Sequence, residues 1–279
     1  MARAIERIER DIAALKEAIR AIALELQSAD ASYLNTLGLA VRKQLILASY
    51  HLCTQGYPEN FLHLSLNQRQ QLQQAIRKLG QVAAEQLLSC IKSEQAEVDK
   101  GDDEDESNKE VTSSELLDTS NFQPPSADTS NPIELAKWQQ NLEEVTQEIL
   151  KKLSHDANLL LQKSGVLPKK LPEPILAAAA AAASEASAEA MPGPPNLLNL
   201  VIEIENEQQS EDSGLTQIMA INLRLGEIEF ADVALSSERR QIRSILVQLN
   251  KLGREYQKKH REKAIAEAEA AWRASWFED

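Results

Sequence analysis

A strict heptad repeat occupies the first 29 residues and limits this chain to folds in which that segment is a helix packed along a second helix. Apolar residues recur there at alternating intervals of three and four positions. On an α-helix these positions form one narrow seam, which is typical of a coiled coil rather than of a globular helix. The pattern predicts contact with another helix, from this chain or from a second copy. The seam residues are Ile5, Ile8, Ile12, Leu15, Ile19, Ile22 and Leu26.

A second heptad seam lies in a helix that we predict over about residues 236–276. Ser236 or Ser237 is its expected N-cap, because a serine hydroxyl can accept a hydrogen bond from a free N–H of the first turn. The apolar positions of this seam are Ile242, Ile245, Leu249, Leu252 and Tyr256.

The composition favours the same fold class. Good helix formers dominate, while aromatic residues make up only 4% of the 279 positions and glycine occupies 9. Such a composition points to long helices with narrow seams rather than to a thick globular core. We therefore predict an all-α fold of elongated helical hairpins and coiled coils joined by disordered linkers.

Changes in apolar pattern and charge divide the chain into five predicted segments. Residues 93–131 carry a net charge of −10 and few apolar side chains, too few to offset the entropy lost on ordering. The segments are an N-terminal antiparallel module of three helices (1–92, with helices at about 2–29, 31–54 and 66–92), an acidic disordered linker (93–131), a heptad helix (132–166), a Pro/Ala-rich spacer (167–195) and a C-terminal helical or coiled-coil module (196–279).

Local signals place several helix boundaries. A break is expected at residues 56–58, followed by a short connection to residue 64. Ser65 with Gln68 forms a capping-box pattern, so a helix should begin directly after Ser65. Asn131 and Pro132 match an N-cap followed by the first helical position.

Two further signals concern the end of the middle helix and the start of the last module. Gly165 fits a C-cap. The apolar patch at residues 197–204 fits either a helix or a strand, with the helix preferred. Residues 218–228 also fit both, because periodicity cannot separate the two in so short a segment.

Four basic residues, Lys251, Arg254, Lys258 and Arg261, repeat at the seam's spacing but are displaced from it by two positions. Two positions are about 200° of helix rotation, so this stripe is expected opposite the seam. The simplest interpretation is a solvated helix face. The alternatives are pairing with the acidic linker and binding of an anionic partner such as RNA, DNA or a lipid surface.

Trp272 and Trp276 are four positions apart, so they share one helix face, with Phe277 close by. Packing against the protein's own helices is the simplest interpretation. Tryptophan is also enriched at interface hot spots, so these residues are candidates for docking a partner. A membrane-surface anchor is a third possibility, against which Glu278 and Asp279 count.

The cysteines, Cys53 and Cys90, fall in apolar helical segments and are predicted to be buried, reduced thiols. With His51 and His63 they could be assembled into a zinc site. Their spacing matches no compact Cys/His pattern, however. We expect no metal and no cofactor.

The functional prediction rests on helix pairing. The chain contains no P-loop, G-x-G-x-x-G, G-x-S-x-G or H-E-x-x-H motif. We predict a non-enzymatic structural or adaptor protein that acts through helix–helix association, as a homo-oligomer or with an unidentified protein. The alternative is a regulatory protein that binds nucleic acid or the ribosome through the basic stripe. The net charge of −13 disfavours general nucleic-acid binding.

The expected location is the cytoplasm. Charged residues interrupt the apolar runs at the N-terminus, so no signal peptide is predicted. No stretch reaches the roughly 18 apolar residues of a membrane span.

Overall fold

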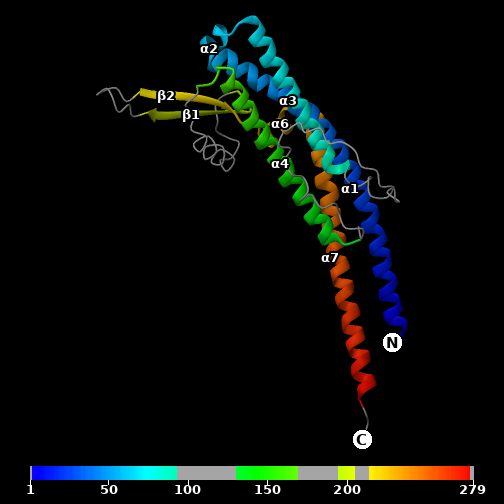
Figure 1. Cartoon of the computed structure of the whole chain (residues 1–279). Helices are drawn as coiled ribbons and strands as arrows, with labels where there is room; N and C mark the ends of the chain where they lie inside the picture. Colours follow the sequence, from blue (N-terminus) through cyan, green and yellow to red (C-terminus); the bar gives the residue numbers. More distant parts are fainter. Residues whose placement is uncertain (1, 93–129, 169–193, 205–213, 277–279) are drawn as a thin grey trace, which may run out of the picture. The chain divides into compact units, whose positions relative to one another are not determined.

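The computed structural model describes residues 2–92, 130–168, 194–204 and 214–276, and this part of the chain is helical apart from one two-stranded ribbon (Figure 1). The predicted all-α fold class is confirmed. Most of the predicted acidic linker and of the Pro/Ala-rich spacer lies outside the described residues. The elements are α1 (Ala2–His51), a π-helical turn η1 (Leu52–Gly56), α2 (Pro58–His63), α3 (Leu66–Lys92), α4 (Pro132–Lys163), β1 (Leu197–Ile204), β2 (Gly214–Ile221), α6 (Leu225–Ala231) and α7 (Val233–Ser275).

The chain forms two compact units, each assembled from segments far apart in the sequence. Unit 1 comprises Met1–Tyr33, Cys90–Glu144 and Ser237–Asp279. Unit 2 comprises Leu34–Ser89 and Val145–Ser236. Helices α1 and α4 contribute turns to both units.

Helix α1 runs unbroken for 50 residues, so the prediction of two helices at 2–29 and 31–54 was wrong. No glycine or proline precedes Gly38 to interrupt the helix. Gly38 itself has a packing role in unit 2, because a Cβ added there would lie 3.0 Å from the Cβ of Ala84 in α3. The missing side chain therefore allows the two helix backbones to approach closely.

The turn from α1 to α3 largely follows the local signals. The predicted break is present: the Tyr57 N–H donates to the Leu52 carbonyl at 2.8 Å, which closes η1. The connection after it is the short helix α2, in which Pro58 occupies a first-turn position that does not require its missing N–H. The capping box is confirmed, since the Ser65 N–H donates to Gln68 Oε1 at 2.8 Å and the Gln68 N–H donates to Ser65 Oγ at 3.3 Å.

Both predicted ends of α4 are confirmed. The Ile133 N–H donates to Asn131 Oδ1 at 3.1 Å, so Asn131 caps the helix that begins at Pro132. Gly165 adopts a φ of +85° just after the helix, and its N–H donates to the Gln162 carbonyl at 3.0 Å. A positive φ at this position is readily adopted by glycine.

Helix α7 begins earlier than predicted, and its cap is Asp232 rather than Ser236 or Ser237. Asp232 Oδ1 accepts hydrogen bonds from the N–H groups of Ala234 and Leu235, at 3.0 and 3.3 Å. A carboxylate at this position also interacts favourably with the helix dipole. Leu235, seven positions before Ile242, is fully buried and extends the seam into this first turn, so the apolar pattern continues past the two serines that were expected to cap the helix.

Residues 197–204 form strand β1, so the preference for a helix was wrong. β1 pairs antiparallel with β2, and Leu197 lies opposite Ile221. A two-stranded ribbon is marginally stable alone. In unit 2, side chains from neighbouring segments form hydrogen bonds with the backbone of β2 at Met219 and Ile221.

Two side chains pair with alternate residues of β2. The Tyr57 hydroxyl accepts from the Met219 N–H at 3.0 Å and donates to the Met219 carbonyl at 3.2 Å. The Asn158 amide of α4 donates to the Ile221 carbonyl and accepts from the Ile221 N–H, both at 2.8 Å. These contacts join residues 63 to 162 positions apart, which is why a local reading of the apolar patch missed the ribbon.

Candidate functional site

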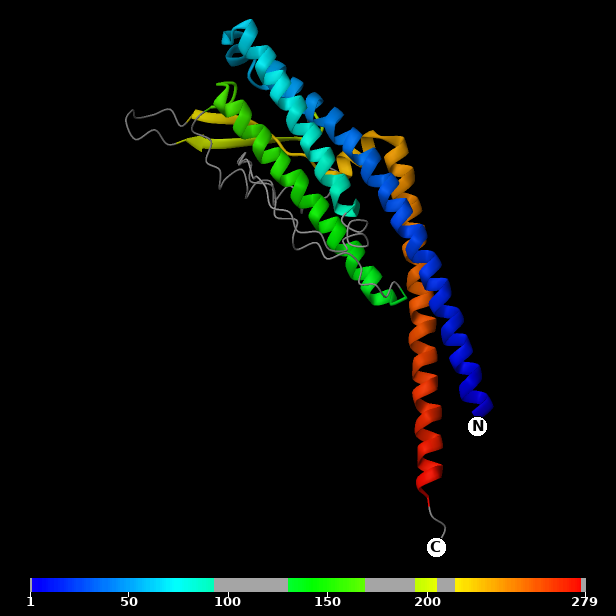
Figure 2. The ribbon, with the colours of Figure 1, turned by 45° about the vertical axis from the view of Figure 1, so that its right-hand side comes forward.

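Within unit 1, the first part of α1 and α7 lie side by side and antiparallel (Figures 1 and 2). Polar contacts between the two helices fix how they are aligned. A residue that lies later in α1 contacts one that lies earlier in α7, as expected for antiparallel helices. Lys259 and Lys263 donate hydrogen bonds to the carboxylates of Glu262 and Glu9, respectively, and these bonds raise the pKa values of the two lysines. The contacts are Glu9 Oε1–Lys263 Nζ at 2.8 Å, Asp11 Oδ2–Lys259 Nζ at 3.1 Å, and a 2.7 Å hydrogen bond from Ser32 Oγ to Glu238 Oε1.

The two predicted seams are the most buried parts of these helices. In α1, Ile12, Ile19, Ile22 and Leu26 are buried, and Ile5, Ile8 and Leu15 are half-buried. In α7, Ile242, Ile245 and Leu249 are buried, and Leu252 and Tyr256 are half-buried. The arrangement is an antiparallel helix pair within one chain, so the α1 seam already has a partner in α7.

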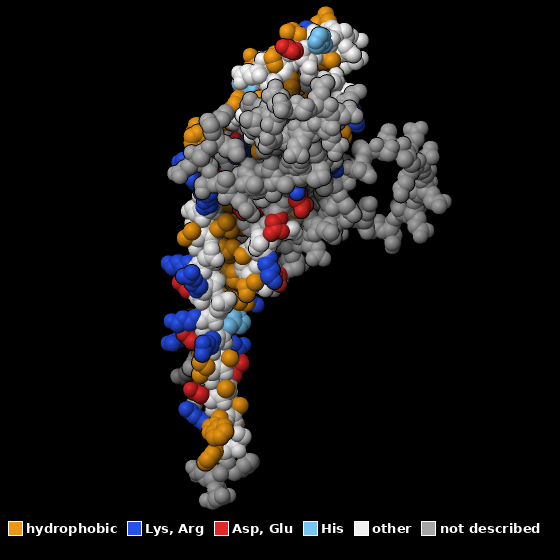
Figure 3. Space-filling view, turned by 90° about the vertical axis from the view of Figure 1, so that its left-hand side faces the viewer, with side chains coloured by type: hydrophobic (Ala, Val, Ile, Leu, Met, Phe, Trp, Pro, Cys, Tyr) orange, Lys and Arg blue, Asp and Glu red, His pale blue; other side chains and the backbone are white. Residues whose placement is uncertain are grey.

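The predicted basic stripe lies on the opposite face of α7, where Lys251, Arg254, Lys258 and Arg261 are all exposed. Figure 3 shows basic side chains recurring along this helix. The stripe is longer than predicted, because Arg240 and Arg243 continue the same helical face toward the start of α7 and are also exposed. We call this surface, from Arg240 to Trp276, the outer face of α7.

The predicted aromatic pair lies at the far end of the outer face. Trp272 is 66% exposed and Trp276 is 64% exposed. Their rings pack on each other with centroids 5.8 Å apart and planes tilted by 39°. The interpretation as internal packing is therefore wrong for these two residues, while Phe277 lies outside the described residues.

A second exposed surface, which the sequence only hinted at, lies on α1 in unit 2. In the sequence, Ile46 and Leu47 broaden the apolar side of this helix. Leu39, Ile46 and Tyr50 follow one another at helical spacing and remain 51%, 46% and 58% exposed, with Leu47 beside them at 39%. We call Leu39, Ile46, Leu47 and Tyr50 the α1 strip.

A buried acid in unit 1 was not predicted. Asp30 is only 1% exposed, and burial raises its pKa to about 7. Gln139 Nε2 of α4 donates to Asp30 Oδ1 at 3.3 Å, and Arg239 of α7 forms an ion pair with Glu143 at 2.6 Å nearby. Asp30 Oδ2 has no hydrogen-bond partner among the described residues, so the charged form of this acid is poorly compensated.

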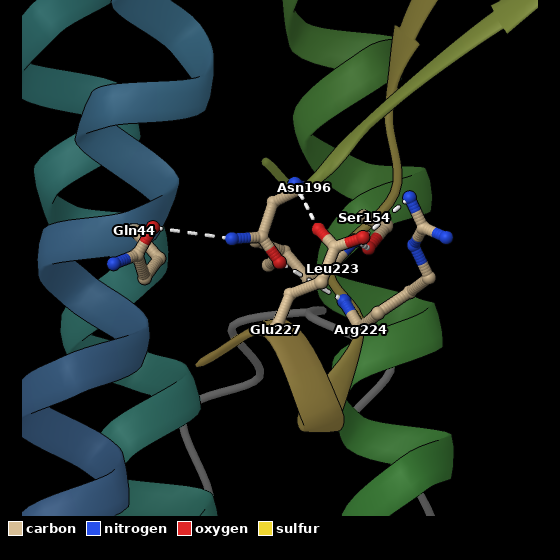
Figure 4. A network of polar contacts seen from close by, with 6 residues as sticks. All are labelled: Gln44, Ser154, Asn196, Leu223, Arg224 and Glu227. Carbon is tan, nitrogen blue, oxygen red and sulfur yellow. Dashed lines mark hydrogen bonds and ion pairs between the residues drawn. The ribbon is translucent and has the colours of Figure 1, made fainter. Parts of the chain in front are cut away.

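A polar network in unit 2 holds the start of β1 near the end of β2 (Figure 4). Asn196 is fully buried and has a φ of +60°, a conformation that asparagine tolerates better than most residues. Its side chain donates to Gln44 Oε1 and accepts from the Arg224 N–H, both at 3.1 Å, while its own N–H donates to Glu227. Arg224 and Glu227 form an ion pair at 2.5 Å.

Ser154 of α4 links the end of β2 to the same network. Its hydroxyl accepts from the Leu223 N–H at 2.9 Å and donates to the Leu150 carbonyl at 2.8 Å. These polar groups bind backbone atoms or one another, so their role in this structure is to position the ribbon and α6.

The cysteine and histidine residues do not assemble into a metal site in the part of the chain that is described. Cys53 and Cys90 are buried free thiols, as predicted. Burial raises the pKa of Cys53 to about 11 and also raises that of Cys90, which makes both poor nucleophiles at neutral pH. No group of three His, Cys, Asp or Glu residues in the described segments could hold a metal ion.

None of the described helices has an apolar stretch long enough to cross a membrane. In comparisons with known proteins, no family model, curated protein or solved structure matches this chain.

Proposed function

We propose that this protein is a non-enzymatic structural or adaptor protein that associates with other copies of itself through helix–helix contacts. The observation that carries the proposal is the α1 strip. Four large apolar residues on one helical face remain substantially exposed, and contiguous exposed apolar residues of this kind mark interaction sites.

The spacing of the strip supports a helical partner. Leu39, Ile46 and Tyr50 are separated by seven and four positions, so they project from one side of α1 as the residues of a coiled-coil seam do. Lys43 lies between them and is exposed. A single charged residue within an apolar seam favours one register over the others.

A second copy of the chain is the proposed occupant. The heptad seam at the start of α1 is already paired with α7 in the same chain, so self-association requires a different surface. The strip provides one on the same helix, and a two-fold axis through its centre would place Leu39 of each copy beside Tyr50 of the other. Contacts of this isologous type are the commonest in soluble homo-oligomers.

Sedimentation velocity tests this proposal. We expect the wild-type protein to form a dimer at micromolar concentration and the Leu39→Glu/Ile46→Glu variant to be monomeric with unchanged helicity. Leu24→Glu with Leu66→Glu is the matched control, because these leucines are exposed by 68% and 70% outside the strip. A monomeric wild-type protein, or equal dimerisation of all three, would rule out the strip as the self-association site.

The alternative function is regulation through nucleic acid bound by the basic stripe. It is supported by the exposure of Lys251, Arg254, Lys258 and Arg261. Binding of RNA or duplex DNA that weakens steeply with salt and is lost on substitution of these residues would favour this alternative.

A further inference from the structure

The outer face of α7 combines a basic row and an aromatic pair that were first identified separately. Successive residues of an α-helix are rotated by about 100° around its axis. Every residue of the basic stripe therefore lies within roughly 40° of Val247 around the axis of α7. Six residues in this angular range are basic, namely Arg240, Arg243, Lys251, Arg254, Lys258 and Arg261. In the same angular range, Ile265, Trp272 and Trp276 follow the last arginine, and Glu269 is the one acid among these positions.

All positions of the outer face are exposed, and the basic ones differ from the lysines that hold α7 to α1. Lys259 and Lys263 continue the seam spacing of α7, three and seven positions after Tyr256, and form ion pairs with Asp11 and Glu9 of α1. Within the described segments, the six basic residues of the outer face form no ion pair that fixes them to α1 or α4. Their charge is therefore directed toward solvent.

The geometry suits a planar surface. From Arg240 to Arg261 the row extends about 32 Å along one unbroken helix, and about 54 Å to Trp276. Since all these side chains leave the helix in nearly the same direction, a flat anionic layer can meet all of them together. A nucleic-acid duplex curves away from a straight rod and offers phosphates to only part of such a row.

The apolar residues of the row favour a lipid layer over other anionic surfaces. Val247 and Ile265 are 69% and 51% exposed, and the two tryptophans are exposed by about two thirds. Tryptophan partitions into the interface between lipid headgroups and acyl chains, where its ring is buried and its N–H remains hydrated. Basic residues beside such anchors add electrostatic attraction to anionic headgroups.

We propose that the outer face of α7 binds the surface of a bilayer containing anionic lipids, with α7 lying parallel to the bilayer and Trp272 and Trp276 inserted at the headgroup level. This surface belongs to unit 1, whereas the α1 strip belongs to unit 2, so the inference extends beyond the proposed self-association and does not depend on it. Its chemistry is recognition of a negatively charged lipid surface by arginine, lysine and tryptophan.

Co-sedimentation of the full chain with vesicles tests the proposal. We expect binding to phosphatidylcholine vesicles that contain phosphatidylserine, little binding to pure phosphatidylcholine, and loss of binding at high salt. Substitution of Lys251, Arg254, Lys258 and Arg261 by Gln should weaken binding by several hundred-fold, from about fivefold per basic residue.

The matched control removes the same charge elsewhere. Arg77, Lys78, Lys137 and Lys151 are exposed basic residues outside the outer face, and their substitution by Gln should leave vesicle binding within a few-fold of wild type. Equal losses in the two quadruple variants would overturn the proposal, because net charge rather than the outer face would then control binding. Circular dichroism verifies that both variants remain folded.

Tryptophan fluorescence tests the orientation. We expect a blue shift of emission on addition of phosphatidylserine vesicles, and its loss in Trp272→Ala/Trp276→Ala, because the remaining Trp138 is already buried. Failure of the wild-type protein to bind these vesicles at low salt would overturn the proposal. Binding of duplex DNA or RNA through the same four residues, without vesicle binding, would also overturn it in favour of the nucleic-acid alternative.

Discussion

Asn in place of Asp30 should stabilise the protein at neutral and alkaline pH. The carboxyl is almost completely buried in α1, and the Gln139 amide donates a hydrogen bond to its Oδ1, while Oδ2 has no hydrogen-bond partner among the described residues. Asparagine keeps an oxygen that can accept this hydrogen bond and removes the charge. Replacing a buried, poorly compensated charge by a neutral group of the same shape lowers the cost of folding.

The size of the stabilisation by Asp30→Asn follows from the pKa of Asp30, which burial raises from 3.8 to about 7. Below about pH 4 the carboxyl is neutral in both the folded and the unfolded states and imposes no penalty. Between about pH 4 and pH 7 the unfolded chain loses this proton while the folded chain retains it, so the free energy of unfolding falls. Above pH 7 the full penalty is present, and about three pKa units correspond to roughly 4 kcal/mol.

Urea unfolding followed by circular dichroism, from pH 4 to pH 8.5, measures this effect. The difference between Asp30→Asn and wild type should be near zero at pH 4 and grow to several kcal/mol in favour of the variant by pH 8. Asp11→Asn, at a half-exposed residue paired with Lys259, is the control and should change stability by only about 0–1 kcal/mol. A variant that is less stable than wild type at pH 8 would show that Asp30 forms a stabilising charge pair with Arg239.

Three further changes test the packing of the two units by thermal melts. Ile12→Asp with Ile19→Asp should destabilise the protein by several kcal/mol, since Ile19 is fully buried; an unchanged melt would mean that the α1 seam is not buried. Tyr57→Phe should lower the free energy of unfolding by about 1–3 kcal/mol, because it removes the hydroxyl that pairs with Met219. An unchanged stability would show that this hydroxyl does not stabilise the ribbon. Gly38→Leu should cost about 1–3 kcal/mol by separating α1 from Ala84, whereas a neutral result would contradict that close approach.

The sequence predicted the parts of the fold that depend on neighbouring residues. Heptad spacing identified Ile19 and Leu249 as buried positions, and the caps at Ser65 and Asn131 were found because each cap bonds to a residue two or three positions away. The two-residue offset also predicted that the face containing Arg254 would be exposed.

The remaining features depend on contacts distant in sequence. Strand β1 pairs with β2, and the side chains of Tyr57 and Asn158 bind the backbone of β2. The apolar pattern of an eight-residue segment does not reveal such distant partners. Asp30 falls between the two helices predicted at 2–29 and 31–54, so its burial within one continuous helix was not predicted. Only the position of Gln139, over 100 residues away, shows that it is buried within α1.

Helix α1 pairs through its heptad seam with α7 of the same chain and leaves other surfaces for partners. Cross-linking of Asp11→Cys with Lys259→Cys by a short bismaleimide, in a chain that also carries Cys53→Ala and Cys90→Ala, distinguishes this pairing from one between two chains. We predict rapid cross-linking within single chains at all protein concentrations, because Asp11 Oδ2 and Lys259 Nζ lie 3.1 Å apart in the native chain. Cross-links formed only between chains, and increasing with concentration, would show that the seam joins two copies and that α1 is not paired with α7 of its own chain.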